Sequence, residues 1–124
     1  MKMWKSKPLL YIAGPMTSEG NPYYNIKTAV EAAQYAKSLG WAVCIPHLDC
    51  LAAMITGPTN YSVLDNDFNL LYRCSAILIL PFKVEKKDEV ATGTSQEVDF
   101  AASMCIPMYS LETLPTAMEF PWAF

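Results

Sequence analysis

Four short, almost wholly apolar runs constrain the fold of this chain more than any other feature of its sequence. They span residues 9–13, 41–45, 76–80 and 106–109, and the first three end at a proline or a Gly-Pro pair. Apolar runs of four or five residues between such breakers are typical of strands that are covered on both faces. We therefore expect a parallel sheet of four to five strands.

Between these runs, the apolar residues follow the period of an α-helix. Residues 25–39 place apolar side chains on one helical face, with Asn25 as the expected cap and Gly40 as the stop. Residues 62–73 and 94–104 form two further helical segments. The chain is therefore expected to alternate strands with helices.

The segment between the second strand and the second helix has the least regular pattern. Residues 47–60 are mixed in polarity, and only residues 51–55 are expected to form a short helical turn. The order of the other elements predicts a Rossmann- or flavodoxin-like α/β fold, with helices on both faces of a parallel sheet. The length of 124 residues suits a single domain, residues 1–124, with one core.

The C-terminal segment, residues 110–124, is predicted to form an arm on this domain or an added edge strand. It contains two prolines and several aromatic residues. An arm of this kind can cover the sheet or join a second subunit. We favour a subunit interface, because exposed Phe120, Trp122 and Phe124 would make the surface adhesive.

Charge and composition exclude several classes of protein. The net charge is −3 and the nine Lys and Arg residues form no cluster, so duplex nucleic acid is not an expected partner. No apolar run approaches the roughly 18 residues of a membrane span. The first 13 residues lack the pattern of a secretory signal, so we expect a cytoplasmic protein without a membrane partner.

Metal and cofactor motifs are not found in the sequence. Four cysteines form no Cys-x-x-Cys pair and His47 is the single histidine, so we expect neither a disulfide nor a metal site. No G-x-G-x-x-G or P-loop motif is present, which argues against dinucleotide and P-loop binding. We therefore expect no cofactor.

Ligands of parallel sheets bind outside the carboxyl ends of the strands, so three loops are candidates for the binding site. The loop after Ala13 has backbone amides and small hydroxyls that can hold a polar ligand beside the phenol of Tyr11. The second loop begins near His47, and the third precedes residue 94. A lone histidine after a strand, such as His47, is more often structural than catalytic. The candidate substrate-binding residues are Gly14, Met16, Thr17, Ser18, His47, Gly93, Thr94 and Ser95.

Asp67 lies near the centre of the apolar arc of the helix at residues 62–73, where a charge is costly. Asp65 falls on the opposite, solvent side of the same helix. An acid that faces a core either holds a structural network together or acts in a pocket, and the pattern leaves both interpretations open.

Glu97 stands three residues after Thr94 at the start of a predicted helix. A capping box, in which both side chains bond to backbone amides, explains this spacing. In a functional interpretation, the positive end of the helix keeps Glu97 ionised and therefore nucleophilic at the ligand edge of the sheet. Spacing alone favours the capping box.

Three stretches of the sequence together resemble a known enzyme family. They are YIAGPM in and after the first strand, NDFNLLYRCSAILIL running into the third, and GTSQEVDFAA at the last helix. Their order and spacing cover most of residues 9–109. The chain resembles the superfamily of nucleoside 2-deoxyribosyltransferases and deoxynucleoside 5'-monophosphate N-glycosidases, and within it a small subgroup that carries the motif GPMT.

The resemblance implies an enzyme that cleaves the N-glycosidic bond of a (deoxy)nucleoside or its 5'-monophosphate. Glu97 matches the nucleophile, Asp67 matches an acid beside the sugar and the base, and Tyr11 matches the tyrosine that positions the nucleophile. Water or an acceptor base then resolves the glycosyl-enzyme intermediate. The family's transferases complete each site with C-terminal residues of a neighbouring subunit, which implies a homodimer or a higher homo-oligomer.

Two departures from the family pattern leave the substrate open. Ala91 stands where the transferases carry an aspartate six residues before the nucleophile, and the first loop has no arginine for a 5'-phosphate. The main alternative is a non-catalytic module that binds or senses a nucleotide in the same pocket. A third interpretation is a structural or subunit-interaction protein that relies on the aromatic C-terminal segment.

Overall fold

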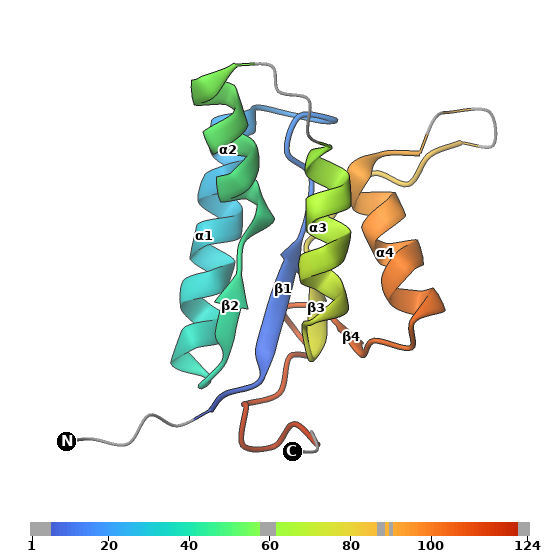
Figure 1. Cartoon of the computed structure of the whole chain (residues 1–124). Helices are drawn as coiled ribbons and strands as arrows, with labels where there is room; N and C mark the ends of the chain where they lie inside the picture. The colour runs from blue at the N-terminus through green and yellow to red at the C-terminus, as the bar shows by residue number, and fades with distance from the viewer. Residues whose placement is uncertain (1–5, 58–61, 87–88, 90, 122–124) are drawn as a thin grey trace.

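The computed structural model describes residues 6–57, 62–86, 89 and 91–121, and within them strands and helices alternate along the chain (Figure 1). In chain order, these elements are β1 (Leu9–Ala13), α1 (Pro22–Ser38), β2 (Ala42–Cys44), α2 (Pro46–Thr56), α3 (Val63–Tyr72), β3 (Ala76–Ile79), α4 (Gly93–Ser103) and β4 (Met108–Tyr109). None of the helices in this described part has the length and apolar character needed to cross a membrane.

The described strands form one parallel sheet in the order β2-β1-β3-β4, which confirms the predicted α/β fold. β1 is central, and its Leu10 is in register with Val43 of β2 on one side and Ala76 of β3 on the other. The chain leaves β1 through α1 to reach β2, and then passes through α2 and α3 to β3. The connections therefore diverge at the carboxyl end of β1, where sheets of this kind bind ligands.

Successive residues of β1 face opposite sides of the sheet, and helices cover both sides as predicted. Tyr11 and Ala13 face α3 and α4, and they belong to the core of that side. Leu10 and Ile12 face α1 and belong to the other core. The small side chains that α1 buries against the sheet are Ala29, Ala32, Ala33 and Ala36.

α1 begins earlier than predicted because a different asparagine caps it. Asn21 Oδ1 accepts hydrogen bonds from the backbone N of Tyr23 (2.9 Å) and of Tyr24 (3.4 Å). Pro22 occupies the first helical position, which its fixed φ suits. The expectation that Asn25 caps this helix is wrong, because Asn25 lies inside it and its side chain bonds to the preceding loop.

α2 is a full helix of 11 residues, where the sequence pattern predicts one short turn at residues 51–55. Pro46 ends the strand run in the sequence, but it also opens this helix at the first position. The helix ends at Gly57, whose φ of +84° is easily adopted only by glycine. The longer helix brings Cys50 to the carboxyl edge of the sheet.

The described part of the C-terminal segment forms turns against the α1 face of the sheet, without an added edge strand. Phe120 is only 6% exposed and packs on Trp41, with ring centroids 4.9 Å apart. Trp41 Nε1 donates a hydrogen bond to Pro115 O at 2.9 Å. The expectation that Phe120 is exposed for a subunit interface is wrong, because its ring completes this core; Trp122 and Phe124 lie outside the described residues.

Candidate functional site

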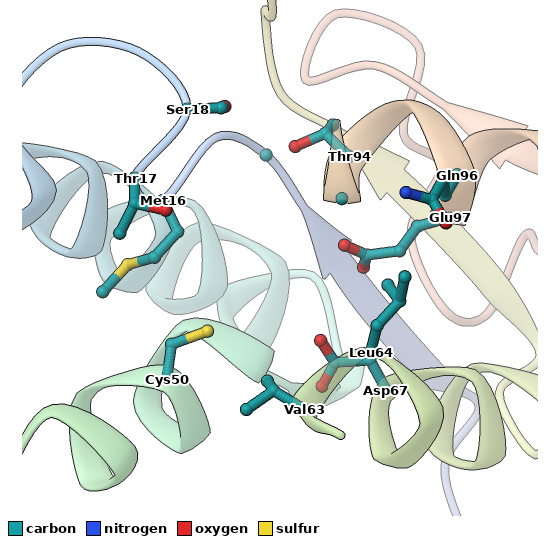
Figure 2. A pocket seen from close by; sticks show the side chains of 12 residues that line it. Met16, Thr17, Ser18, Cys50, Val63, Leu64, Asp67, Thr94, Gln96 and Glu97 are labelled. Atoms are coloured by element: carbon teal, nitrogen blue, oxygen red, sulfur yellow. The ribbon is translucent and has the colours of Figure 1, made fainter. Parts of the chain in front are cut away.

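Three segments meet at the carboxyl edge of the sheet and surround a pocket of about 240 Å³ (Figure 2). They are the loop after β1, the first half of α3 and the start of α4, and α2 adds one residue. Figure 2 shows Asp67 and Glu97 pointing into the same space from α3 and α4. The described residues that line the pocket are Gly14, Met16, Thr17, Ser18, Cys50, Val63, Leu64, Asp67, Gly93, Thr94, Gln96 and Glu97.

The start of the first loop is held by close packing and by a buried histidine. A Cβ on Gly14 would lie 3.0 Å from Cβ of Leu80, tighter than most side chains pack, so a larger residue there would require Leu80 to move. His47 is 3% exposed, and its Nε2 donates to Pro15 O at 3.2 Å. Burial lowers the pKa of His47, which favours the neutral imidazole with its proton on Nε2. His47 therefore supports the loop and is not among the described lining residues.

The middle of the same loop is tethered on two sides. Asn25 of α1 donates from Nδ2 to Met16 O (3.0 Å) and to Glu19 O (2.7 Å). Glu19 Oε2 in turn accepts a hydrogen bond of 2.9 Å from the backbone N of Lys83, after β3. These bonds hold Met16 on the pocket wall and leave Thr17 exposed at its edge.

Asp67 reaches the pocket because of where α3 begins. Ser62 caps this helix, and its Oγ accepts a hydrogen bond from Asp65 N at 3.1 Å. Asp67 is 5% exposed and Asp65 lies at the surface, as the helical pattern predicted. Burial raises the pKa of Asp67 to about 7, with a smaller contribution from the carboxylate of Asp49 on α2.

Glu97 lies in the second turn of α4 and is 7% exposed. Thr92 caps this helix, with its Oγ1 accepting from Ser95 N at 3.3 Å, so the predicted capping box of Thr94 and Glu97 does not form. Burial is the largest effect on the carboxyl and raises the pKa of Glu97 to about 8, although the Tyr11 hydroxyl opposes it. The expectation that the helix start keeps Glu97 ionised is wrong, because the free amides of the first turn precede it.

Four buried side-chain atoms in the described part of the chain have no hydrogen-bond partner, and three of them lie in or directly behind this pocket. These three are Tyr11 Oη, Asp67 Oδ1 and Glu97 Oε2, and the fourth is His47 Nδ1. Burial and the nearby Glu97 raise the pKa of Tyr11, so its phenol stays a neutral donor. Buried polar atoms are nearly always paired, so such a cluster is typical of a functional site.

Two of the predicted binding residues lie off the pocket wall, and four unpredicted residues lie on it. Ser95 joins His47 outside the described lining, and its amide bonds to the helix cap Thr92. Cys50 was not anticipated because α2 was expected to be a short turn. The other unpredicted lining residues are Val63 and Leu64, which belong to the apolar arc of α3, and Gln96.

The two acids are the only charged groups among the described lining residues. The described ranges contain no cluster of three His, Cys, Asp or Glu side chains that could hold a metal ion. Burial raises the pKa values of Asp67 and Glu97 to about 7 and about 8, so near neutral pH one acid can be protonated while the other is ionised. A protonated and an ionised carboxyl in one pocket can donate a proton and attack an electrophilic carbon.

Comparison with known proteins places this site within one family. A family model described as "Domain of unknown function (DUF4406)" matches residues 8–109, from the start of β1 to the end of β4. The first loop and both acids lie inside the match. No curated protein matches the chain.

Proposed function

We propose that this chain, which belongs to the DUF4406 family, is an enzyme that cleaves the N-glycosidic bond of a nucleoside or a nucleoside 5'-monophosphate. The observation that carries the proposal is the pair of buried carboxyl groups, Asp67 and Glu97, which converge on one pocket and each keep an unpartnered oxygen. The motifs YIAGPM, NDFNLLYRCSAILIL and GTSQEVDFAA, which resemble those of the nucleoside 2-deoxyribosyltransferase superfamily, support the same function.

In the first step, a carboxylate oxygen of Glu97 forms a bond to the anomeric carbon while the bond between this carbon and the base nitrogen breaks. The electron pair of the broken bond stays on the base, which takes a proton from Asp67. The products are a glycosyl ester of Glu97 and a free, neutral base. This step requires an ionised Glu97 and a protonated Asp67, with one proton between them.

Tyr11 helps to set this distribution of the proton. In the free protein, burial raises the pKa of Glu97 to about 8 and that of Asp67 to about 7, so both acids can bind a proton near neutral pH. The phenol of Tyr11, which has no hydrogen-bond partner among the described residues of the free protein, lowers the pKa of Glu97 and is free to donate to the carboxylate during the reaction. The positive charge that develops on the sugar also stabilises the Glu97 carboxylate, and so it lowers the pKa of Glu97 further.

In the second step, water or an acceptor base attacks the anomeric carbon. The ester bond to Glu97 breaks, its electron pair returns to the carboxylate, and Asp67 takes the proton of the acceptor. Water as the acceptor gives hydrolysis, and a base gives transfer. The described lining offers the hydroxyls of Thr17 and Ser18 but no cation, so we favour an unphosphorylated nucleoside as the substrate.

We also propose a homo-oligomer, as the resemblance to the transferases implies. The described part of this chain's own C-terminal segment packs on the α1 face, whereas the acids belong to the α3–α4 side. That part does not line the pocket of its own chain. Light scattering after size-exclusion chromatography tests this proposal, and a monomer at all concentrations would contradict it.

Chromatography of a substrate panel tests the catalytic proposal. The protein is incubated with ribonucleosides, deoxyribonucleosides and their 5'-monophosphates, with and without a free acceptor base, and released base is measured. We expect Asp67→Asn to lose base release. Asp65→Asn, the same change on the exposed side of the same helix, should retain it.

Each result of the panel has a distinct meaning. Base release without an acceptor identifies a hydrolase, and exchange only with an acceptor identifies a transferase. A nucleoside that raises the melting temperature but is recovered intact would support the binding module instead. Base release at the wild-type rate from Glu97→Gln would contradict the assigned nucleophile.

A further inference from the structure

We infer that the pocket wall formed by Met16, Cys50 and Val63 receives the base of the substrate, so that the sugar lies against Thr94 and Glu97. The inference rests on the proposed function and assigns the orientation of the substrate in the same pocket. We call these three side chains the base wall.

The base wall is built from three separate segments. Met16 belongs to the loop after β1, Cys50 to α2, and Val63 to the first turn of α3. All three side chains are partly buried and none carries a charge. Figure 2 shows them grouped on the side of the cavity away from Glu97. The pocket therefore has a largely apolar side, with Thr17 beside Met16 at its edge. The other, more polar side carries the Thr94 hydroxyl and the Glu97 carboxyl together with Leu64.

The chemistry of these two sides matches the two parts of a nucleoside. A purine or pyrimidine ring presents flat faces, which the polarizable sulfurs of Met16 and Cys50 and the methyl groups of Val63 can contact. A sugar carries hydroxyl groups that need hydrogen-bond partners when they are buried. The Thr94 hydroxyl and the Glu97 carboxyl supply such partners on the polar side.

Asp67 lies between the two sides, where the bond to be cleaved must lie. Figure 2 shows its carboxyl next to Val63 and open to the space that Glu97 faces. Val63 of the base wall precedes Asp67 by four residues on α3, so the two side chains are neighbours on one face of the helix. A base on this wall has its glycosidic nitrogen near Asp67 and the anomeric carbon near Glu97. The reverse orientation would separate the leaving nitrogen from its proton donor.

Alkylation of Cys50 measures occupancy of the base wall without requiring turnover. The native protein is treated with N-ethylmaleimide, and modification of each cysteine is followed by peptide mass spectrometry. Adenine or thymine, present at ten times its Kd, should slow alkylation of Cys50 by about tenfold. Cys105, which is exposed and does not line the pocket, is the internal reference and should react at an unchanged rate. 2-Deoxyribose alone should slow neither cysteine.

A matched pair of variants provides a second readout, the Kd of adenine from melting temperatures. Met16→Ala should weaken adenine binding at least about fivefold because it removes one sulfur from the base wall. Met118→Ala makes the same change at a residue that is 96% exposed, and it should leave the Kd unchanged. Equal Kd values in both variants would overturn the inference. This readout does not require Cys50 to react in the free protein.

The outcomes separate this inference from the proposed function. Protection of Cys50 by 2-deoxyribose and not by the bases would overturn the assigned orientation. Absence of protection by any base, in a protein that does release base from nucleosides, would overturn the base wall and leave the enzyme intact. Protection by bases in a protein that cleaves no nucleoside would support the base wall and contradict the catalytic proposal.

Discussion

The two faces of the sheet share one central strand but differ in how their buried polar groups are paired. On the α1 face, the buried Trp41 indole donates to Pro115 O, and none of the unpartnered buried atoms in the described residues belongs to that core. On the α3–α4 side, Tyr11, Asp67 and Glu97 each leave an oxygen unpaired. The alternation of side chains along β1 separates the two environments.

This difference indicates that the faces have different tasks. Apolar contacts on the α1 face, such as that of Phe120 with Trp41, stabilise the fold. Burial of Asp67 and Glu97 opposes folding, because it disfavours the charged forms of both carboxyls. We therefore expect substitutions on the two faces to change stability in opposite directions. Five measurements test this difference or the chemistry of the α3–α4 side.

Glu97→Gln should have the largest effect, and it should change activity and stability in opposite ways. Base release should fall by roughly 10³-fold or more, because an amide cannot serve as the nucleophile. The free energy of unfolding at pH 8 should rise, since the variant no longer buries a charge. Rate assays and urea denaturation of one preparation measure both. A variant that is both inactive and less stable at pH 8 would contradict the difference between the faces.

The stability of the wild-type protein should fall as pH rises from about 4 through the folded pKa values of about 7 and about 8, and level off above them. Asp67 and Glu97 have folded pKa values of about 7 and about 8, above their ordinary values of about 4, so the folded state binds both protons more tightly. This contribution is complete below about pH 4, and it falls by up to about 1.4 kcal/mol per pH unit for each carboxyl. Urea denaturation between pH 5 and 9 measures it.

The control for this pH dependence is the double variant Asp67→Asn with Glu97→Gln. It cannot bind or release these two protons, so its stability should change much less over the same pH range. Equal pH dependence in the double variant and the wild type would show that other groups cause it.

Phe120→Ala should lower the free energy of unfolding by about 3 kcal/mol, because it removes a buried ring from the α1 face. Activity per folded molecule should not change, since the ring is on the side of the sheet away from the acids. Urea denaturation gives the first quantity and initial rates the second. Met118→Ala, a change at an exposed residue nearby in sequence, should alter neither.

The rate of base release should depend on pH in a narrow bell. Only the form of the protein with one proton on Asp67 and Glu97 is active, so kcat/KM should peak between the pKa values of about 7 and about 8. Outside these limits, kcat/KM should change by up to about tenfold per pH unit. A rate that stays constant from pH 5 to 9 would exclude a proton shared by this pair.

His47→Leu should have the smallest effect, because it removes one neutral hydrogen bond behind the first loop. We expect a loss of about 1 kcal/mol of stability and a modest rise in KM. His47→Gln can still donate an N–H to Pro15 O, and it should restore much of the lost stability and bring KM back towards the wild-type value. Hydrogen exchange of the amides of residues 14–18 is the direct measurement, and equal exchange in all three proteins would contradict the supporting role.

The elements that the sequence predicted well are those with a strong local pattern. The strand runs gave β1 to β4 closely, because a strand buried on both faces needs a continuous apolar run and a breaker after it. The inward position of Asp67 followed from the period of α3 alone. α2 was underestimated because Pro46 and the Gly57-Pro58 pair indicated breaks in the chain and the mixed polarity of residues 47–60 favoured a loop.

The position of Glu97 shows the limit of local reasoning. Its spacing from Thr94 favoured a capping box, and only the resemblance to a known superfamily suggested a nucleophile. The cap is Thr92, two residues earlier, so Thr94 and Glu97 are both free to face the pocket. Local spacing could not distinguish these two threonines, because each can cap a helix.

The sequence by itself determined the alternation of strands and helices and the buried face of α3, since both depend on the period of neighbouring residues. Only the tertiary structure decided that Cys50 reaches the pocket, that Phe120 completes the α1 face, and that burial raises the pKa values of the two acids. These features depend on which segments, far apart in the chain, come into contact and exclude water.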